Sequence, residues 1–378
     1  MKGKRVSYVE LYLDLVFVLA VGRLAHFMVA EPEGHSVIVA LGLFVVLWWT
    51  WIGFAVLYNR HGDDDRQEHL LFLVGSVPIG VAAVALEPAA HGDIAVFAGA
   101  MAVVRLVLAV SHGEGATDFR ARITRAYVLS ALLFAVSIVV PEPFTYFVWL
   151  VAVGNESRAL LRNDKTQPGQ TLDPHHFAER FALFMIILLG EVLIEAGQAP
   201  VEDTAGWIAL AAAMVLAGAL WWLYFDSAAE LNLQVLELSG GSPTMARAIY
   251  AAGHMLPAFS LLAIAAGVGL MLEEDPPQFA FWLASTGVGV YLLGTRVFLR
   301  AARQRGLGAV LPILLIVATF NLGRLHEVLS PHEFLFFLTA WVTGCAALST
   351  AAQPPARRTD SPPAPGRSPH PASPSPPE

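Results

Sequence analysis

The sequence predicts an all-α protein, a bundle of about twelve transmembrane helices with no separate water-soluble domain. Of its 378 residues, 56% are hydrophobic and only 14% are charged, whereas soluble globular chains carry about 25% charged residues. Mean hydropathy is +0.59. The charges lie in short clusters, and the apolar runs between them reach the roughly 20 residues that a spanning helix needs.

The predicted spans follow one another along almost the whole chain. In order they are 8–29, 36–58, 69–86, 93–111, 122–140, 143–162, 176–197, 204–226, 246–271, 278–299, 308–326 and 332–352. Basic residues precede the first span, but that span contains Glu10 and Asp14 and no small-residue cleavage site follows it. We therefore expect the first helix to be retained rather than removed as a signal peptide.

The loops between these spans differ in charge on the two sides of the bundle. Arginine and lysine gather on one side, for example at 158–165 and 300–305, whereas the other side carries short acidic loops such as 31–33, 202–203 and 273–275. The positive-inside rule then places both termini in the cytoplasm.

The two halves of the chain look related, because four features recur in the same order. These are the helix starts Tyr8-Val-Glu10 and Phe177-Ala-Glu179, the pairs Trp48-Trp49 and Trp221-Trp222, the prolines Pro78 and Pro257, and the arginines Arg105 and Arg296. Chance similarity among apolar helices is the alternative. With an even number of helices in each unit, both run the same way, so we predict a parallel 6+6 internal duplication.

This duplication defines the predicted domains. Residues 1–170 form a first six-helix membrane unit with a polar linker, and residues 171–352 form the second six-helix unit. The segment 353–378 is a Pro/Ser-rich cytoplasmic tail, whose composition predicts disorder.

Ionisable side chains inside apolar helices are the candidate functional residues, since a charge at the bilayer centre costs ~2.5–3.5 kcal/mol on insertion scales. Glu10 and Asp14 lie four residues apart and share one helix face. They form either a proton or cation site, or carboxylates that pair with arginines of neighbouring helices and fix the packing. Arg105, in mid-span, needs a carboxylate, and Asp14 and Glu191 are the candidates.

The seventh span carries the most ionisable groups: Glu179, Arg180, Glu191 and Glu195. Arg180 and Glu191 fall on one face, about 16 Å apart along the axis. Glu191 is the deeper acid, and the small Gly190 beside it would allow a helix or ligand to approach closely. Glu195 lies near the outer end, where we expect it to be solvated.

His254 and Asp226 complete the candidate set. His254 precedes Pro257, which frees a backbone carbonyl, so the imidazole could help to satisfy that carbonyl or could transfer protons. A neutral histidine hydrogen-bonded within the bundle is the alternative. Asp226 follows an aromatic run, 221–225, that is typical of a membrane interface.

Signatures of other function classes are missing from the sequence. No Ser/His/Asp elbow, P-loop or metal-ligand spacing occurs, and no basic patch with interleaved aromatics suggests nucleic acid. The single cysteine, Cys345, cannot form an intrachain disulfide, and the histidine pair at 175–176 has no companion ligands. We expect no cofactor and no metal, and the expected partners are the lipid bilayer and a small solute, proton or cation.

Several segments resemble the signatures of the bacterial low temperature requirement A family. They are Glu10-Leu-Tyr-Leu-Asp14, Glu179-Arg180 through Gly190-Glu191, Leu220-Trp-Trp-Leu-Tyr-Phe-Asp226 and His254-Met-Leu-Pro257. The resemblance extends to about residue 352 and implies a multi-pass protein of the bacterial inner membrane. It marks Glu10, Asp14, Glu179, Arg180, Gly190, Glu191, Asp226 and His254 as signature positions. It implies no particular substrate or reaction.

The two-unit architecture and the carboxylates in the leading helix of each half favour a secondary transporter or permeation protein, proton- or cation-coupled. In this hypothesis Glu191 and Asp14 form the ionisable centre, Arg105 is the countercharge and His254 an accessory. A membrane-embedded enzyme acting on lipid or another hydrophobic substrate is one alternative. A structural or sensory membrane protein linked to growth in the cold is the other.

Overall fold

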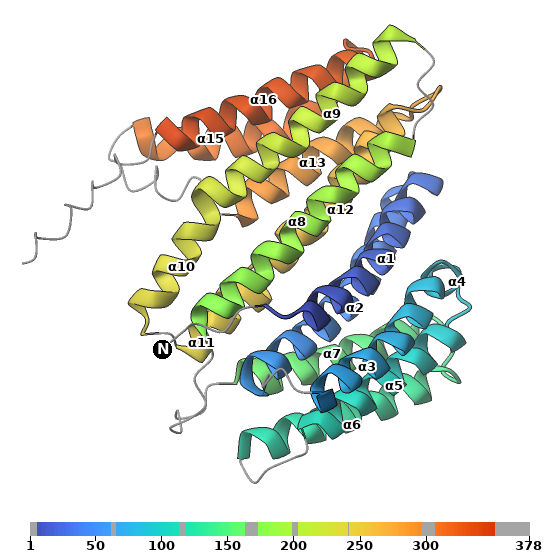
Figure 1. The fold of residues 1–378 in the computed structure, drawn as a ribbon. Helices are drawn as coiled ribbons and strands as arrows, with labels where there is room; N and C mark the ends of the chain where they lie inside the picture. Colours follow the sequence, from blue (N-terminus) through green and yellow to red (C-terminus); the bar gives the residue numbers. More distant parts are fainter. Residues whose placement is uncertain are drawn as a thin grey trace, which may run out of the picture.

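The computed structural model describes residues 6–61, 66–112, 118–162, 173–198, 203–240, 242–295 and 307–351, and all regular secondary structure in these ranges is helical (Figure 1). Arg296 and the predicted tail at 353–378 lie outside the described residues. The prediction of an all-α chain is confirmed for the described part.

The helices of the first half are α1 (Tyr8–Ala30), α2 (Gly34–His61), α3 (Arg66–Val84), α4 (Leu86–Ala90), α5 (Ala95–His112), α6 (Asp118–Ser137) and α7 (Phe144–Leu161). Those of the second half are α8 (Pro174–Gln198), α9 (Thr204–Leu223), α10 (Ala229–Leu238), α11 (Pro243–Ala246), α12 (Met255–Met271), α13 (Gln278–Gly294), α15 (Leu307–Asn321) and α16 (Pro331–Ala351). Three tighter or wider turns join them: the π-helical η1 (Tyr224–Ala228) and η2 (Arg247–Ala252), and the 3₁₀-helical η3 (Leu322–Glu327).

Seven helical segments of the described chain are long and apolar enough to cross a membrane, and α3 and α13 contain shorter apolar stretches. Large apolar side chains cover the outer surface of the bundle, among them Leu15, Val77, Val110, Leu132 and Phe147. In water such a surface would be unfavourable, whereas in lipid it matches its surroundings. The protein is therefore a helical membrane bundle, and the total of twelve spans stays a prediction.

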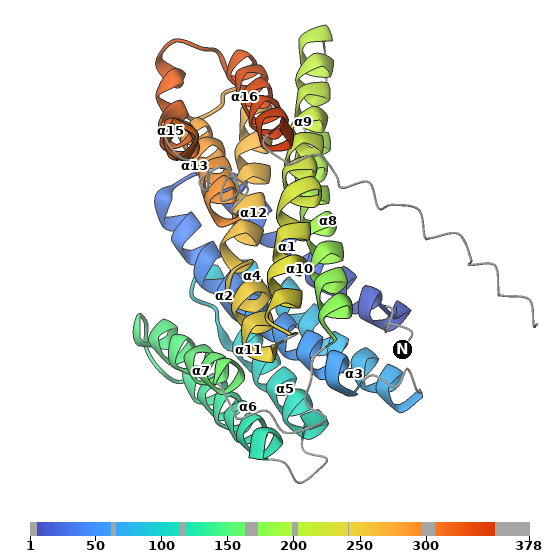
Figure 2. The ribbon, with the colours of Figure 1, turned by 90° about the vertical axis from the view of Figure 1, so that its left-hand side faces the viewer.

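The helices form two neighbouring groups, α1 to α7 and α8 to α16, as both views show (Figures 1 and 2). Between the groups α1 packs against α8 and α12, and α2 also contacts both of these helices. Helix α12 is the most enclosed of them, because every residue from Pro257 to Met271 is buried. The interface of α1, α8 and α12 thus lies at the centre of the protein.

Helix α1 begins with a capping box that also places its first carboxylate. The Ser7 hydroxyl accepts a hydrogen bond from the Glu10 amide at 3.4 Å, and the Glu10 carboxylate accepts one from the Ser7 amide at 3.1 Å. This arrangement satisfies two amides that a helix start leaves unpaired. It also turns the Glu10 side chain back into the bundle, where it is fully buried.

Candidate functional site

A fully buried ion-pair network joins α1, α2 and α8 near their shared end. The Arg180 guanidinium lies with Nη2 2.8 Å from Asp14 Oδ1 and Nε 3.5 Å from Glu10 Oε1. The Trp51 indole donates a hydrogen bond to Asp14 Oδ1 at 2.7 Å, and its ring lies 5.6 Å from the guanidinium carbon. Such a cation–π contact further stabilises a buried guanidinium. We call Glu10, Asp14, Trp51, His176 and Arg180 the α1–α8 network.

His176, one turn before Arg180, connects this network to Asn59 near the end of α2. Its Nε2 lies 3.1 Å from Glu10 Oε2, and its Nδ1 lies 3.0 Å from the Asn59 amide nitrogen. Asn59 is itself held by the Asp173 backbone, donating to the carbonyl at 3.2 Å and accepting from the amide at 3.0 Å. The Tyr58 ring stacks on the imidazole. Every one of these contacts fixes the orientation of His176.

A second polar layer lies further along α8, where Glu191 and Glu195 are 3% and 4% exposed. Among the residues that the structure describes, neither carboxyl has a hydrogen bond or an ion pair. Two glycines make room for the carboxyls. A Cβ on Gly22 of α1 would lie 3.0 Å from Glu191 Oε1, and one on Gly269 of α12 would lie 3.2 Å from Glu195 Oε2.

One expectation for this layer was wrong. Glu195 is buried rather than solvated, because α12 covers the end of α8 with Gly269. No other helix of the described chain approaches Gly190 closely, because no atom lies within 4 Å of the position of a Cβ there; the approach of a ligand at Gly190 stays a prediction. The close approach at Glu191 is made instead by Gly22, a residue of another helix.

Arg105 forms an ion pair apart from the network. Its Nε lies 3.0 Å from Glu156 Oε1 of α7 and its Nη2 3.5 Å from Oε2, and both side chains are buried. The guanidinium also lies over the Phe134 ring at 4.5 Å. The expected partners Asp14 and Glu191 are therefore wrong, since Arg105 is on a helix that packs beside α6 and α3 rather than beside α8.

The remaining candidates lie outside the network. Glu179 is exposed although it precedes Arg180, since adjacent helical residues point about 100° apart. Asp226 is half-buried and accepts a hydrogen bond from the Thr350 hydroxyl at 3.2 Å. His254 is buried, with Nε2 3.0 Å from the Tyr224 hydroxyl and Nδ1 2.9 Å from the Ile249 carbonyl in the π-helical turn η2.

Sequence reasoning missed several members of the site. His176 stands four residues before Arg180, so its helical spacing could have identified it. Glu156, Trp51 and Asn59 come from helices that the sequence does not pair with one another, and no local signal identifies their partners. No group of three or more His, Cys, Asp or Glu residues in the described ranges is arranged to hold a metal ion.

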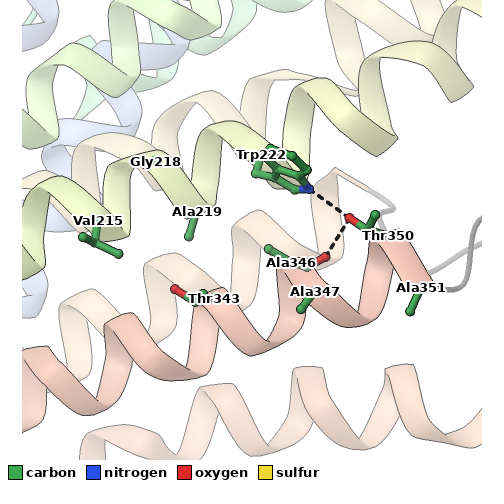
Figure 3. Close-up of a pocket in the computed structure, with 9 residues that line it drawn as sticks. All are labelled: Val215, Gly218, Ala219, Trp222, Thr343, Ala346, Ala347, Thr350 and Ala351. Carbon is green, nitrogen blue, oxygen red and sulfur yellow. Dashed lines mark hydrogen bonds between the residues drawn. The ribbon is translucent and has the colours of Figure 1, made fainter.

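A lateral groove of about 740 Å³ lies between α9 and α16 (Figure 3). Its lining is mostly small and apolar: Val215, Gly218, Ala219, Trp222, Thr343, Ala346, Ala347, Thr350 and Ala351. The polar groups are already engaged. The Trp222 indole donates to the Thr350 hydroxyl at 2.9 Å, and the Thr343 hydroxyl donates to the Thr339 carbonyl at 2.8 Å.

The fold and the buried polar layers define an integral membrane protein, a helical bundle built around ionisable side chains. The chain matches the family model "Bacterial low temperature requirement A protein (LtrA)" over residues 5–349 and belongs to that family. It is similar to the uncharacterized protein RA0937 of Rhizobium meliloti (strain 1021), with 27% identity over 342 residues, 84% of this chain and 83% of the relative. No solved structure matches it. The family resemblance predicted from the sequence is confirmed.

Proposed function

We propose that this protein is a secondary transporter or permeation protein of the bacterial inner membrane, coupled to protons or another small cation. The observation that carries this proposal is the interface of α1 and α8, where two layers of buried ionisable side chains lie along the same helix pair. Arg180 and Glu191 stand eleven residues apart on α8, so the layers are about 16 Å apart. Intramembrane ionisable groups in such a series are typical of ion and proton pathways.

The helix packing supports the proposed 6+6 architecture. In the first half α1 packs on α3, α3 on α5 and α5 on α6; in the second, α8 packs on α12, α12 on α13 and α13 on α15. The contact of α2 with α7 has its counterpart in that of α9 with α16. The units differ at their last pair, because α6 packs on α7 whereas α15, in its described residues, makes no comparable contact with α16. The contacts that they share fit twelve spans, both termini on one side and an ion site between the units, where α1 meets α8.

The second polar layer, formed by Glu191 and Glu195, has the chemistry of a proton carrier. A carboxylate in apolar surroundings without a cation is strongly unfavourable, and protonation removes that cost. Glu191 and Glu195 are buried in this way. A proton entering from the Glu195 end of α8 could be held there, before conformational change or water connects this layer to the α1–α8 network.

The test is proton flux into vesicles that contain the purified protein, driven by an imposed pH gradient. Glu191→Gln and Asp14→Asn keep the size of each side chain and remove its ionisation, and we expect each to reduce flux strongly. Glu179→Gln is the matched control, because Glu179 is on the same helix and exposed. Flux that is unchanged in both test variants would refute the proposal. Replacing Na⁺ by K⁺ or choline in the same assay separates protons from metal cations.

The lateral groove between α9 and α16 does not favour a lipid-modifying enzyme. Its hydroxyl and indole donors are bonded within the protein, and small apolar residues make up the rest of its lining. A purely structural or sensory role makes a different prediction for Glu191→Gln, namely a change in thermal stability with no change in flux.

A further inference from the structure

We propose that Glu10 and Asp14 hold one exchangeable proton between them, so that the α1–α8 network is a proton-binding site rather than a balanced salt bridge. The use of this proton as the coupling ion rests on the proposed function. Its presence in the resting protein does not, and it can be measured without any flux.

Asn59 determines the protonation of His176. The Asp173 amide donates to one end of the Asn59 side chain and the Asp173 carbonyl accepts from the other. These two bonds identify the amide oxygen and nitrogen without ambiguity. The nitrogen of Asn59 therefore faces His176 Nδ1 at 3.0 Å and donates to it.

Because Nδ1 accepts this hydrogen bond, it carries no proton. Nε2 carries the ring proton and donates it to Glu10 Oε2 at 3.1 Å. His176 is thus neutral. An imidazolium would set its Nδ1–H against the N–H groups of Asn59, and relieving that clash would break both bonds to Asp173.

With a neutral His176, the charges of the network do not cancel. Glu10 and Asp14 would supply two negative charges and Arg180 one positive charge, and all three side chains are buried. One excess negative charge would then lie in a low-dielectric interior, where an uncompensated ion costs several kcal/mol. A single proton on either carboxylate removes it.

The unpaired atoms indicate where the proton lies. Each carboxylate has one well-bonded oxygen, Glu10 Oε2 and Asp14 Oδ1. Glu10 Oε1 and Asp14 Oδ2 are buried without a hydrogen-bond partner, and so are the three guanidinium nitrogens of Arg180, of which Nε and Nη2 lie in the ion pairs with Glu10 and Asp14. A protonated carboxyl supplies a donor on one of the two orphan oxygens. One water that accepts from Nη1 and donates to the other orphan oxygen would satisfy those two atoms.

No other described cation provides the missing charge. The titratable or charged groups that neighbouring elements carry at this end of the bundle include Tyr58 of α2, Arg66 and His69 of α3, Glu237 of α10, and Arg247 and Tyr250 of η2. The described cations within ion-pair distance of Glu10 or Asp14 are His176 and Arg180 alone. A proton from the adjoining aqueous phase is the simplest counterion, since two oxygens beside a guanidinium do not make a metal site.

The test is infrared difference spectroscopy of the protein in lipid at neutral pH, which separates protonated carboxyl bands from carboxylate bands. Asp14→Asn leaves Glu10 balanced by Arg180, and Glu10→Gln leaves Asp14 balanced in the same way. Each single variant should therefore remove the whole protonated-carboxyl band of the site, so either suffices if the other fails to fold. Glu179→Gln should leave that band unchanged.

Three results would overturn the inference. The first is protonated-carboxyl absorbance that neither Asp14→Asn nor Glu10→Gln reduces from its wild-type intensity. The second is a band that is absent from the wild type and appears in His176→Gln, because the proton would then reside on His176. The third is a wild-type band that appears only after Na⁺ and K⁺ are removed. If both variants lose the band and the wild-type protein shows no proton flux, the inference of a proton-binding site stands and the proposed transport function is refuted.

Discussion

The ion pair of Arg105 and Glu156 offers a quantitative test of how charge is held inside this bundle. The closest contact, Nε to Oε1, is 3.0 Å, and the two side chains are 0% and 1% exposed. At an effective dielectric constant of about 20, charges at this distance attract by about 5–6 kcal/mol. Desolvation of both ions offsets most of that attraction, so the net value of the pair is small.

Removing one partner has a different effect from removing both. Arg105→Met leaves Glu156 buried without a cation, and Glu156→Leu leaves the guanidinium without an anion. Each should lower the free energy of unfolding by about 3–5 kcal/mol. The double variant removes both charges and should lie within about 1 kcal/mol of the wild type, or above it.

The assay is reversible unfolding in mixed detergent micelles, followed for the wild type, both single variants and the double variant. Arg105→Met combined with Asp14→Asn is the matched control, because Asp14 is paired elsewhere, and there the two losses should add. If the Arg105/Glu156 double variant lost the sum of its single losses, the pairing would be refuted. If Asp14→Asn instead offset the loss of stability caused by Arg105→Met, Asp14 would be the partner of Arg105, as the sequence suggested.

Two further outcomes follow from contacts outside this pair. His91 Nε2 donates to Glu31 at 2.6 Å and Nδ1 faces the Glu87 carbonyl at 2.8 Å, so the hydrogen bond to Glu31 and then that to the carbonyl raise the pKa of His91 above 6.5. The His91–Glu31 pair stabilises the fold fully below about pH 6.5 and loses its effect as the pH rises through the raised pKa. The free energy of unfolding, measured against pH, should show this loss of stability in the wild type and not in His91→Gln. Equal pH profiles for the two proteins would contradict the prediction. Gly267→Ala would place a Cβ 2.8 Å from a backbone nitrogen of α13 and should cost about 1–3 kcal/mol. Gly344→Ala meets no atom within 4 Å and should stabilise by about 0.5–1 kcal/mol; a loss at Gly344 as large as that at Gly267 would argue against this packing.

The sequence predicted the helices well because each one is specified locally. Each of the twelve predicted spans overlaps a long helix of the described chain, from Tyr8–Ala30 to Pro331–Ala351. In lipid a backbone must satisfy its own hydrogen bonds, and an apolar run of sufficient length does so as a helix. The breaks that hydropathy did not predict include the π-helical turns η1 and η2 and the 3₁₀-helical turn η3. At η2 the Trp48 indole of α2 donates to the Ala251 carbonyl at 2.7 Å, a contact with a distant helix that no local pattern predicts.

The candidate site was predicted less completely. Helical spacing correctly put Glu10 with Asp14 on one face, and singled out Arg180 and Glu191 on another helix. It placed Glu179 among the candidates as well, although that side chain is exposed. Spacing along one helix determines which residues share a face, but it contains no information about which helix that face meets.

By itself, the sequence determined that this protein is a member of the low temperature requirement A family and a bundle of apolar helices with acids and arginines inside them. Composition, hydropathy and short signatures are properties of single segments, so folding is not needed to read them. Only the tertiary structure decided that Arg180 meets Asp14, that Arg105 meets Glu156 and that Glu191 meets Gly22. The physical reason is that a buried charge is balanced by whatever the neighbouring helix presents, and helix neighbours follow from packing of the whole bundle.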